Sequence, residues 1–196
     1  MMINIQEDKL VSASDAEEFH RFHGGQAIDW DLLQEANAVL TREAHLLDIG
    51  AYNAWLTHCV AQEVQYQVVS RELRAASERR YQLNDAVNIY NDNYQQLKVR
   101  VEHQLDPQNW GNSPKVRYTR YITNVLVARD KDDLDLLHIR SNVIVQRARR
   151  GNQADLFHAT REDIWRRHGD GHLKLMKRFI DYPERVLQTH NLMLFI

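Results

Sequence analysis

The chain has 196 residues, of which 43% are hydrophobic and 27% are charged, and its formal net charge is −2. These values are typical of a globular protein with one sizeable core, and the nearly balanced charge argues against a nucleic-acid-binding surface. No apolar run approaches the roughly 20 residues of a membrane span, and the acidic first residues lack a signal-peptide pattern, so we expect a cytoplasmic protein.

Residues 1–28 are polar, and we expect an extended or short-helical N-terminal arm with its helical part over residues 15–23. From Asp29 the apolar residues recur every three or four positions, which is the period of one helix face. This stripe consists of Leu33, Ala36, Leu40, Ala44 and Leu47. Gly50 interrupts the pattern, and a second short amphipathic helix is expected with Tyr52, Trp55, Leu56 and Cys59 on its apolar side.

The middle of the chain mixes strand and helix signals. Alternating Val64, Tyr66 and Val68 predict a strand over residues 63–73, and the charged residues 74–92 are expected to be a loop. A four-residue apolar spacing predicts a helix over residues 93–105, and residues 106–114 have the Pro, Gly and Asn content of a turn region. Long strands are expected over residues 116–128 and 173–182, the second after a turn at 168–172.

Residues 138–165 are expected to form the central hairpin of the fold. Gly151 and Asn152 favour a two-residue turn, which would place Arg150 opposite Gln153. That register pairs Ile139 with Ile164, Val143 with Thr160 and Val145 with His158 on the face expected to contact the helices. The other face would carry Arg140, Asn142, Arg161 and Asp163, a mixture that suggests contact with a second protein.

Helices followed by long strands indicate an α+β fold, with N-terminal helices packed on one face of a long, strongly curved, mainly antiparallel sheet. We expect a single domain over residues 1–196. The apolar residues 192–196 would be unfavourable in water, so we expect them to be a docked tail.

The ten histidines raise the possibility of a metal site. His20 and His23 are three apart on a possible helix, and His168 and His172 flank a turn, but neither pair has a third ligand at a recognisable spacing. The one cysteine, Cys59, is expected to be a small buried hydrophobe, and a single thiol cannot hold an iron–sulfur cluster.

Phosphate-binding loops, nucleophile elbows and metalloprotease motifs are absent from the sequence. Glu43 and Asp48 lie near His45 on the first predicted helix and could form an acid–base group at a pocket mouth. Charged residues on the solvent-exposed face of an amphipathic helix are far more common, so we prefer the interpretation that these side chains face solvent. We therefore assign no catalytic, cofactor-binding or metal-binding residue.

Five segments carry a resemblance to a known family. They are LTREAHLLDIGAYNAWL (40–56), VSRELRAASERRY (69–81), LKVRVEHQLDPQNWGNSPK (97–115), HIRSNVI and RARRGNQ (within 138–153), and DYPERVLQTHNLMLFI (181–196). Together they resemble the small, or beta, subunit of aromatic-ring-hydroxylating dioxygenases, most closely the naphthalene dioxygenase group, which includes nitroarene dioxygenases.

The resemblance implies a cone-shaped fold like those of nuclear transport factor and scytalone dehydratase. It also implies an assembly of three small and three large (alpha) subunits, in which the large subunit carries a Rieske two-iron two-sulfur cluster and a mononuclear iron. A ferredoxin and an NADH-dependent reductase would supply electrons, and the complex would add oxygen to an aromatic hydrocarbon to give a cis-dihydrodiol. The small subunit would be structural.

Two hypotheses follow from the sequence. The first is a non-catalytic subunit of an aromatic-ring dioxygenase, which the lone cysteine and the missing catalytic motifs favour. The alternative is a stand-alone dehydratase or isomerase of the same cone fold that uses His45 and Asp48 in its own pocket.

Overall fold

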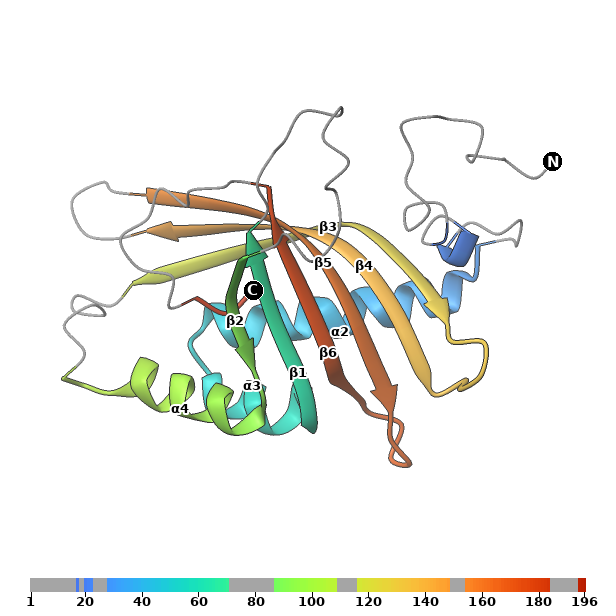
Figure 1. The fold of residues 1–196 in the computed structure, drawn as a ribbon, viewed down its shortest axis with the longest axis horizontal. Helices are drawn as coiled ribbons and strands as arrows, with labels where there is room; N and C mark the ends of the chain where they lie inside the picture. The colour runs from blue at the N-terminus through green and yellow to red at the C-terminus, as the bar shows by residue number, and fades with distance from the viewer. Residues whose placement is uncertain are drawn as a thin grey trace.

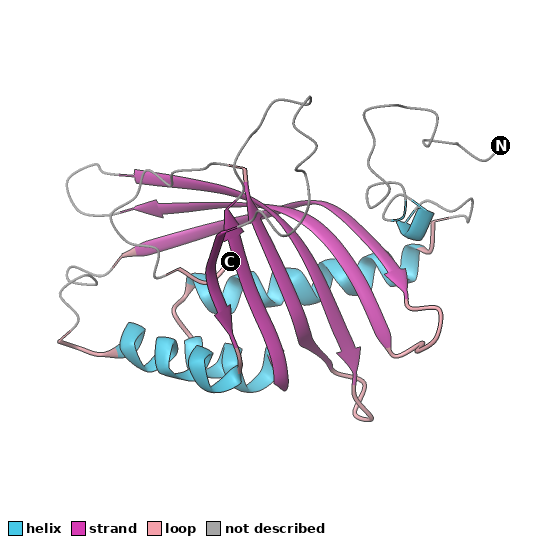
Figure 2. Ribbon diagram, viewed as in Figure 1, coloured by secondary structure: helices cyan, strands magenta, loops and turns pink. Residues whose placement is uncertain are grey.

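The computed structural model describes residues 17, 20–22, 28–70, 87–108, 116–148, 154–183 and 194–196. They form an α+β fold in which helices lie against one face of a six-stranded sheet, as predicted (Figures 1 and 2). Most of the expected N-terminal arm lies outside the described residues, although Glu17 and residues 20–22 are helical. No helix in the described ranges is long and apolar enough to span a membrane.

Three helices have bounds close to those predicted, and local sequence explains their ends. Helix α2 spans Trp30–Asp48, and the side chain of Asp29 caps it by accepting a hydrogen bond from the Leu32 amide at 3.0 Å. Helix α3 spans Tyr52–Cys59 after Gly50, whose positive φ of 75° suits a residue without a Cβ. Helix α4 spans Tyr94–Leu105 and begins with a capping box between Asn93 and Gln96.

The sheet contains β1 (Val60–Ser70), β2 (Val87–Asp92), β3 (Arg117–Arg129), β4 (Leu136–Ala148), β5 (Ala154–Arg167) and β6 (Leu173–Tyr182). Their order is β2-β1-β6-β5-β4-β3, and of these neighbouring pairs only β1–β6 is parallel (Figure 1). The mainly antiparallel sheet is thus confirmed. The predicted loop over 74–92 is wrong for residues 87–92, because they form β2, which pairs antiparallel with residues 66–70 of β1.

The strands curve strongly across α2 (Figure 2). Irregularities interrupt the pairing of β1 with both neighbours, of β3 with β4 and of β5 with β6. In β3 the irregularity lies between Thr123 and Leu126, where Asn124 has a positive φ of 52°. Extra residues of this kind bend a strand and increase its twist, which lets the sheet wrap around the core.

The β4–β5 hairpin forms, but its predicted register is wrong by one residue. Ala148 lies opposite Ala154, so Ile139 faces Asp163 and not Ile164. Residues 149–153, which include the predicted Gly151-Asn152 turn, lie outside the described residues. Because side chains alternate along a strand, the shift by one exchanges the two faces of β5.

Candidate functional site

The molecule's interior contains a cluster of four charged side chains, which are Glu43, Arg161, Asp163 and Arg178. Glu43 comes from helix α2. Buried Leu32, Ala36, Leu40 and Leu47 mark the inner face of α2, and Glu43 lies on the same face at 1% exposure. The preferred prediction of a solvent-facing Glu43 is therefore wrong. A carboxylate in an apolar stripe needs a charged or hydrogen-bonding partner, because burial alone would strongly disfavour its ionised form.

Arg178 on β6 is that partner, and it is fully buried. Its Nη1 and Nη2 donate to Oε1 and Oε2 of Glu43 at 2.8 Å each. Its Nε and Nη2 donate to Oδ1 and Oδ2 of Asp163 on β5 at 2.8 and 2.7 Å. One guanidinium therefore binds two carboxylates in the two-pronged geometry that only arginine provides, and it ties α2 to two neighbouring strands.

Arg161 completes the charge balance of the cluster. Its Nη1 lies 3.5 Å from Oε2 of Glu43, and its Nε lies 3.3 Å from Oδ2 of Asp163. Two tryptophan indoles add neutral donors: Trp55 donates to Glu43 at 3.0 Å and Trp165 donates to Asp163 at 3.3 Å. Two positive and two negative groups thus neutralise one another in a space that excludes water.

Burial and ion pairing shift the pKa values of three groups in this cluster, Glu43, Arg161 and Arg178. Burial by itself would raise the pKa of Glu43, but the guanidinium groups of Arg178 and Arg161 outweigh it, and the pKa lies below its usual value. Burial likewise opposes the charge on Arg178, yet Asp163 and Glu43 hold its pKa well above the usual value. Burial lowers the pKa of Arg161, and electrostatic repulsion from Arg178 lowers it further. Glu43 and Arg178 are therefore held in their charged forms, which makes them poorly suited to exchanging protons with a substrate.

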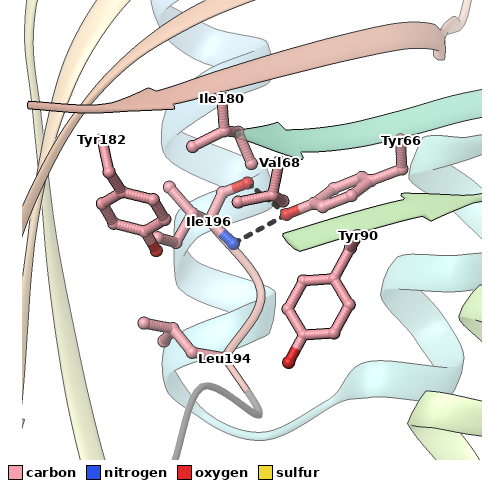
Figure 3. Close-up of a pocket in the computed structure, with 7 residues that line it drawn as sticks. All are labelled: Tyr66, Val68, Tyr90, Ile180, Tyr182, Leu194 and Ile196. Carbon is pink, nitrogen blue, oxygen red and sulfur yellow. Dashed lines mark hydrogen bonds between the residues drawn. The ribbon is translucent and has the colours of Figure 1, made fainter. Parts of the chain in front are cut away.

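The remaining interior space is occupied by Leu194, Phe195 and Ile196, which are 6%, 3% and 2% exposed. The phenol of Tyr66 donates to the main-chain oxygen of Ile196 at 2.7 Å and accepts from its amide at 2.9 Å (Figure 3). Side chains of β1, β2 and β6 surround Leu194 and Ile196 (Figure 3). The gap left between these side chains is too narrow for a water molecule. The interior pocket described here therefore has no room for a substrate.

The structure does not bring His45 and Asp48 together in a pocket. His45 is exposed on α2. Asp48 faces β3, where its carboxylate accepts from the Arg120 amide at 3.0 Å and forms an ion pair with the Arg120 guanidinium. Residues three apart on a helix are neighbours on its surface, but here the Asp48 carboxylate is held by Arg120 of β3 while His45 is exposed.

The histidine pairs and the cysteine are also accounted for. His168 and His172 close the β5–β6 turn through a hydrogen bond from the His168 amide to the His172 carbonyl at 2.9 Å. His20 is exposed, and His23 lies outside the described residues. Among the side chains that the structure describes, no three His, Cys, Asp or Glu residues gather in a way that could hold a metal ion. Cys59 is buried, which raises the pKa of its thiol to about 12 and keeps it protonated.

The sequence interpretation did not find the charged cluster. It placed Arg161 and Asp163 on the outer face of the hairpin, whereas both are on the inner face of β5. The signal that could have found them is the alternation Phe157, Ala159, Arg161, Asp163, Trp165, in which large apolar residues at both ends share one face with the two charges. Arg140 and Asn142 do lie on the opposite, half-exposed face of β4.

Comparison with known proteins identifies the family. Residues 42–189 match the model of the ring hydroxylating beta subunit. The chain belongs to this family. Over all 196 residues and the whole of each relative, it is 70% identical to the small oxygenase component of the naphthalene 1,2-dioxygenase system of a Ralstonia species. It is equally identical to the corresponding component of the 2,4-dinitrotoluene dioxygenase system of Burkholderia sp. strain RASC.

Solved structures agree with the beta-subunit assignment. A structure of naphthalene 1,2-dioxygenase with indole in its active site contains a chain that is 71% identical, with full coverage of both chains and a TM-score of 0.92. The beta subunit of benzoate 1,2-dioxygenase from Burkholderia mallei shares the fold at 20% identity, with coverage of 87% and 99% and a TM-score of 0.60. A scytalone-dehydratase-like protein of Novosphingobium aromaticivorans shares it at 11% identity and a TM-score of 0.54, so the cone-type fold is confirmed.

Proposed function

We propose that this chain is the small component of the terminal oxygenase in an aromatic-ring dioxygenase system that acts on naphthalene-like hydrocarbons or nitroarenes. Relatives with these substrates in their names are 70% identical over the full length, which supports the proposal. A small component implies a large oxygenase partner, and the complex would convert the aromatic ring to a cis-dihydrodiol. Three small and three large subunits would assemble in the cytoplasm, and a ferredoxin and an NADH-dependent reductase would supply electrons.

In this proposal the chain supplies shape and the large subunit supplies the chemistry. A Rieske cluster is held by at least two cysteine thiolates, whereas this sequence has one cysteine, which is buried. The residues present therefore do not fit the cluster, and we place it and the mononuclear iron on the large subunit. We also propose one domain over residues 1–196, with an arm at 1–28 and a docked tail at 192–196; the burial of Leu194–Ile196 supports the tail.

The observation that carries the structural role is the state of the interior. The alternative hypothesis is a dehydratase or isomerase of the same cone fold. Such an enzyme would need an open cavity and a group able to exchange a proton with the substrate. Here Phe195 and Ile196 fill the interior, Glu43 and Asp163 are paired with arginines, and the Asp48 carboxylate is held by Arg120. No feature of the described residues favours the dehydratase or isomerase.

Co-expression with the large oxygenase component of a naphthalene dioxygenase system tests the proposal. The two chains should co-elute at a fixed ratio, and iron and labile sulfide should be found in the complex and not in the isolated small chain. His45→Ala should leave naphthalene turnover by the reconstituted system unchanged, because the exposed imidazole contacts no reacting group. Iron bound to the isolated chain, or turnover of a small hydroxylated substrate by it, would contradict the proposal.

A further inference from the structure

Residues 194–196 are held as a bound peptide would be, through every main-chain oxygen. The Leu194 oxygen accepts from Nη2 of Arg100 at 3.3 Å. The Phe195 oxygen accepts from Nε and Nη2 of Arg120 at 3.1 and 2.6 Å. The Ile196 oxygen accepts from Nη1 of Arg178 at 2.8 Å as well as from Tyr66. Three successive carbonyls thus each meet a different arginine.

The middle side chain has a site of its own. The ring of Phe195 packs against Trp55 and Tyr52, with ring centroids 4.8 and 5.6 Å away. The guanidinium carbon of Arg100 lies 4.9 Å from the centroid of the Phe195 ring, within the range of a cation–π contact. Two aromatic rings and a cation around one ring select an aromatic side chain over an aliphatic one of similar size.

The donors of this site are positioned by partners outside the tripeptide. Arg178 is held by Glu43 and Asp163 within the charged cluster. Arg120 is paired with Asp48 of α2. Arg100 is paired with Asp92 of β2, with Nη1 2.6 Å from Oδ2. Because each guanidinium has a carboxylate of its own, the three arginines stay aligned without help from the residues they bind, which is the condition for a preorganised site.

We propose that the interior of this fold is a binding site for a tripeptide of aliphatic–aromatic–aliphatic sequence, which the chain fills with its own Leu194–Phe195–Ile196. Side chains of Tyr66, Val68, Tyr90, Ile180 and Tyr182 surround the aliphatic side chains of Leu194 and Ile196 (Figure 3). The same peptide, or a small aromatic compound at the Phe195 position, can occupy the site from solution when the chain's own residues are removed. The inference stands independently of the proposed function.

The first test uses the full-length chain with Phe195→Ala and two seven-carbon ring compounds as probes, aromatic toluene and saturated methylcyclohexane. Thermal unfolding should show that toluene stabilises the variant and binds it at least about three-fold more tightly than methylcyclohexane, because only toluene gains the cation–π contact with Arg100. The unsubstituted chain should respond to neither probe. Equal affinities would indicate a featureless apolar cavity and would overturn the proposal.

The second test covers the case in which Phe195→Ala does not fold. A chain that ends at residue 193 is mixed with acetyl-Leu-Phe-Ile, and folding is followed by circular dichroism and tryptophan fluorescence. The peptide should raise the unfolding temperature of this chain, or restore its folded signal if it is unfolded alone. Acetyl-Leu-Ala-Ile should be at least about ten-fold less effective, since it lacks the ring that Trp55 and Tyr52 contact. No response to acetyl-Leu-Phe-Ile, or an equal response to both peptides, would contradict the proposal.

Discussion

Glu35 and Glu43 invite direct comparison, because both lie on α2 and each binds an arginine of the sheet through two hydrogen bonds. Glu35 meets Arg167 at 2.6 and 2.7 Å, and Glu43 meets Arg178 at 2.8 Å twice. The side chains of the first pair are 31% and 27% exposed, whereas those of the second are 1% and 0% exposed. The two pairs have similar hydrogen-bond geometry, and they differ in their burial and in the additional charged partners of the inner pair.

Burial changes what the loss of one partner costs. Water can solvate Arg167 if Glu35 loses its charge, but it cannot reach Arg178 or Arg161 if Glu43 does. Buried ion pairs do not necessarily stabilise a fold more than apolar residues would, yet breaking one leaves an uncompensated charge in the core. The stability of the fold therefore depends on the buried Glu43–Arg178 pair, whereas the exposed Glu35–Arg167 pair adds little to that stability.

The largest expected effect comes from Glu43→Gln, which keeps the shape of the side chain and removes its charge. Two arginines would then face one carboxylate, and we expect the free energy of unfolding to fall by about 3–5 kcal/mol. Urea unfolding of the purified chain measures this loss. A change below about 1 kcal/mol would show that the interior tolerates a net charge, and the comparison with Glu35 would fail.

Replacement of Tyr66 tests the loss of a hydrogen-bonding group that is buried, as Glu43 is, but carries no charge. Tyr66→Phe removes the phenol that bonds both main-chain groups of Ile196 and leaves the Ile196 amide without that acceptor. Stability should fall by about 1–3 kcal/mol, the usual consequence of an unpaired buried polar group. In the same urea experiment this neutral variant should lie between the two glutamate variants, and a loss as large as that of Glu43→Gln would mean that charge is not the decisive factor.

Acid should reproduce part of the Glu43→Gln effect. The pKa of Glu43 is lowered in the folded state from an ordinary value of 4.5, because Arg178 and Arg161 outweigh the effect of burial. Its contribution to stability is then fully present above pH 4.5 and is lost as the pH falls towards the folded-state pKa. Urea midpoints measured from pH 6 down to pH 3 should decline more steeply for the unsubstituted chain than for Glu43→Gln. Parallel declines would contradict the assignment.

The smallest effect is expected from Glu35→Gln, the matched control for the buried pair. Its partner Arg167 remains partly in water, so stability should fall by no more than about 1 kcal/mol, and less in 0.5 M salt than in dilute buffer. Differential scanning calorimetry at two salt concentrations measures both values. A loss comparable to that of Glu43→Gln would place the determining factor in the hydrogen-bond geometry and not in burial.

Local sequence predicted the parts of this fold that depend on local physics. The bounds of α3 and β6 agree with the prediction, since spacing and turn residues determine where such elements begin and end. The faces of β5 were wrong because they depend on the register of the β4–β5 pairing, and a shift of one residue exchanges them. Strand β2 was missed because its residues become a strand only through pairing with β1.

The charged interior was missed for a related reason. Glu43 lies 135 residues before Arg178 in the sequence, and Asp163 and Arg178 come from two consecutive strands. Only the packing of α2 on the sheet decides that they meet. The apolar residues at 194–196 were easier to interpret, because three large hydrophobic side chains have few favourable positions in water.

The parallel pairing of β1 with β6 has a kinetic consequence. Residues 60–70 lie beside residues 173–182, and Tyr66 bonds a residue 130 positions further along the chain. Rates of folding fall as the sequence distance between contacting residues grows, because the intervening chain must first give up its freedom. We therefore expect β1 and β6 to pair late in folding, and until they do their facing edges remain available for pairing with other chains. Early binding to a partner subunit, or folding at low protein concentration, would therefore increase the fraction of this protein that reaches its native state.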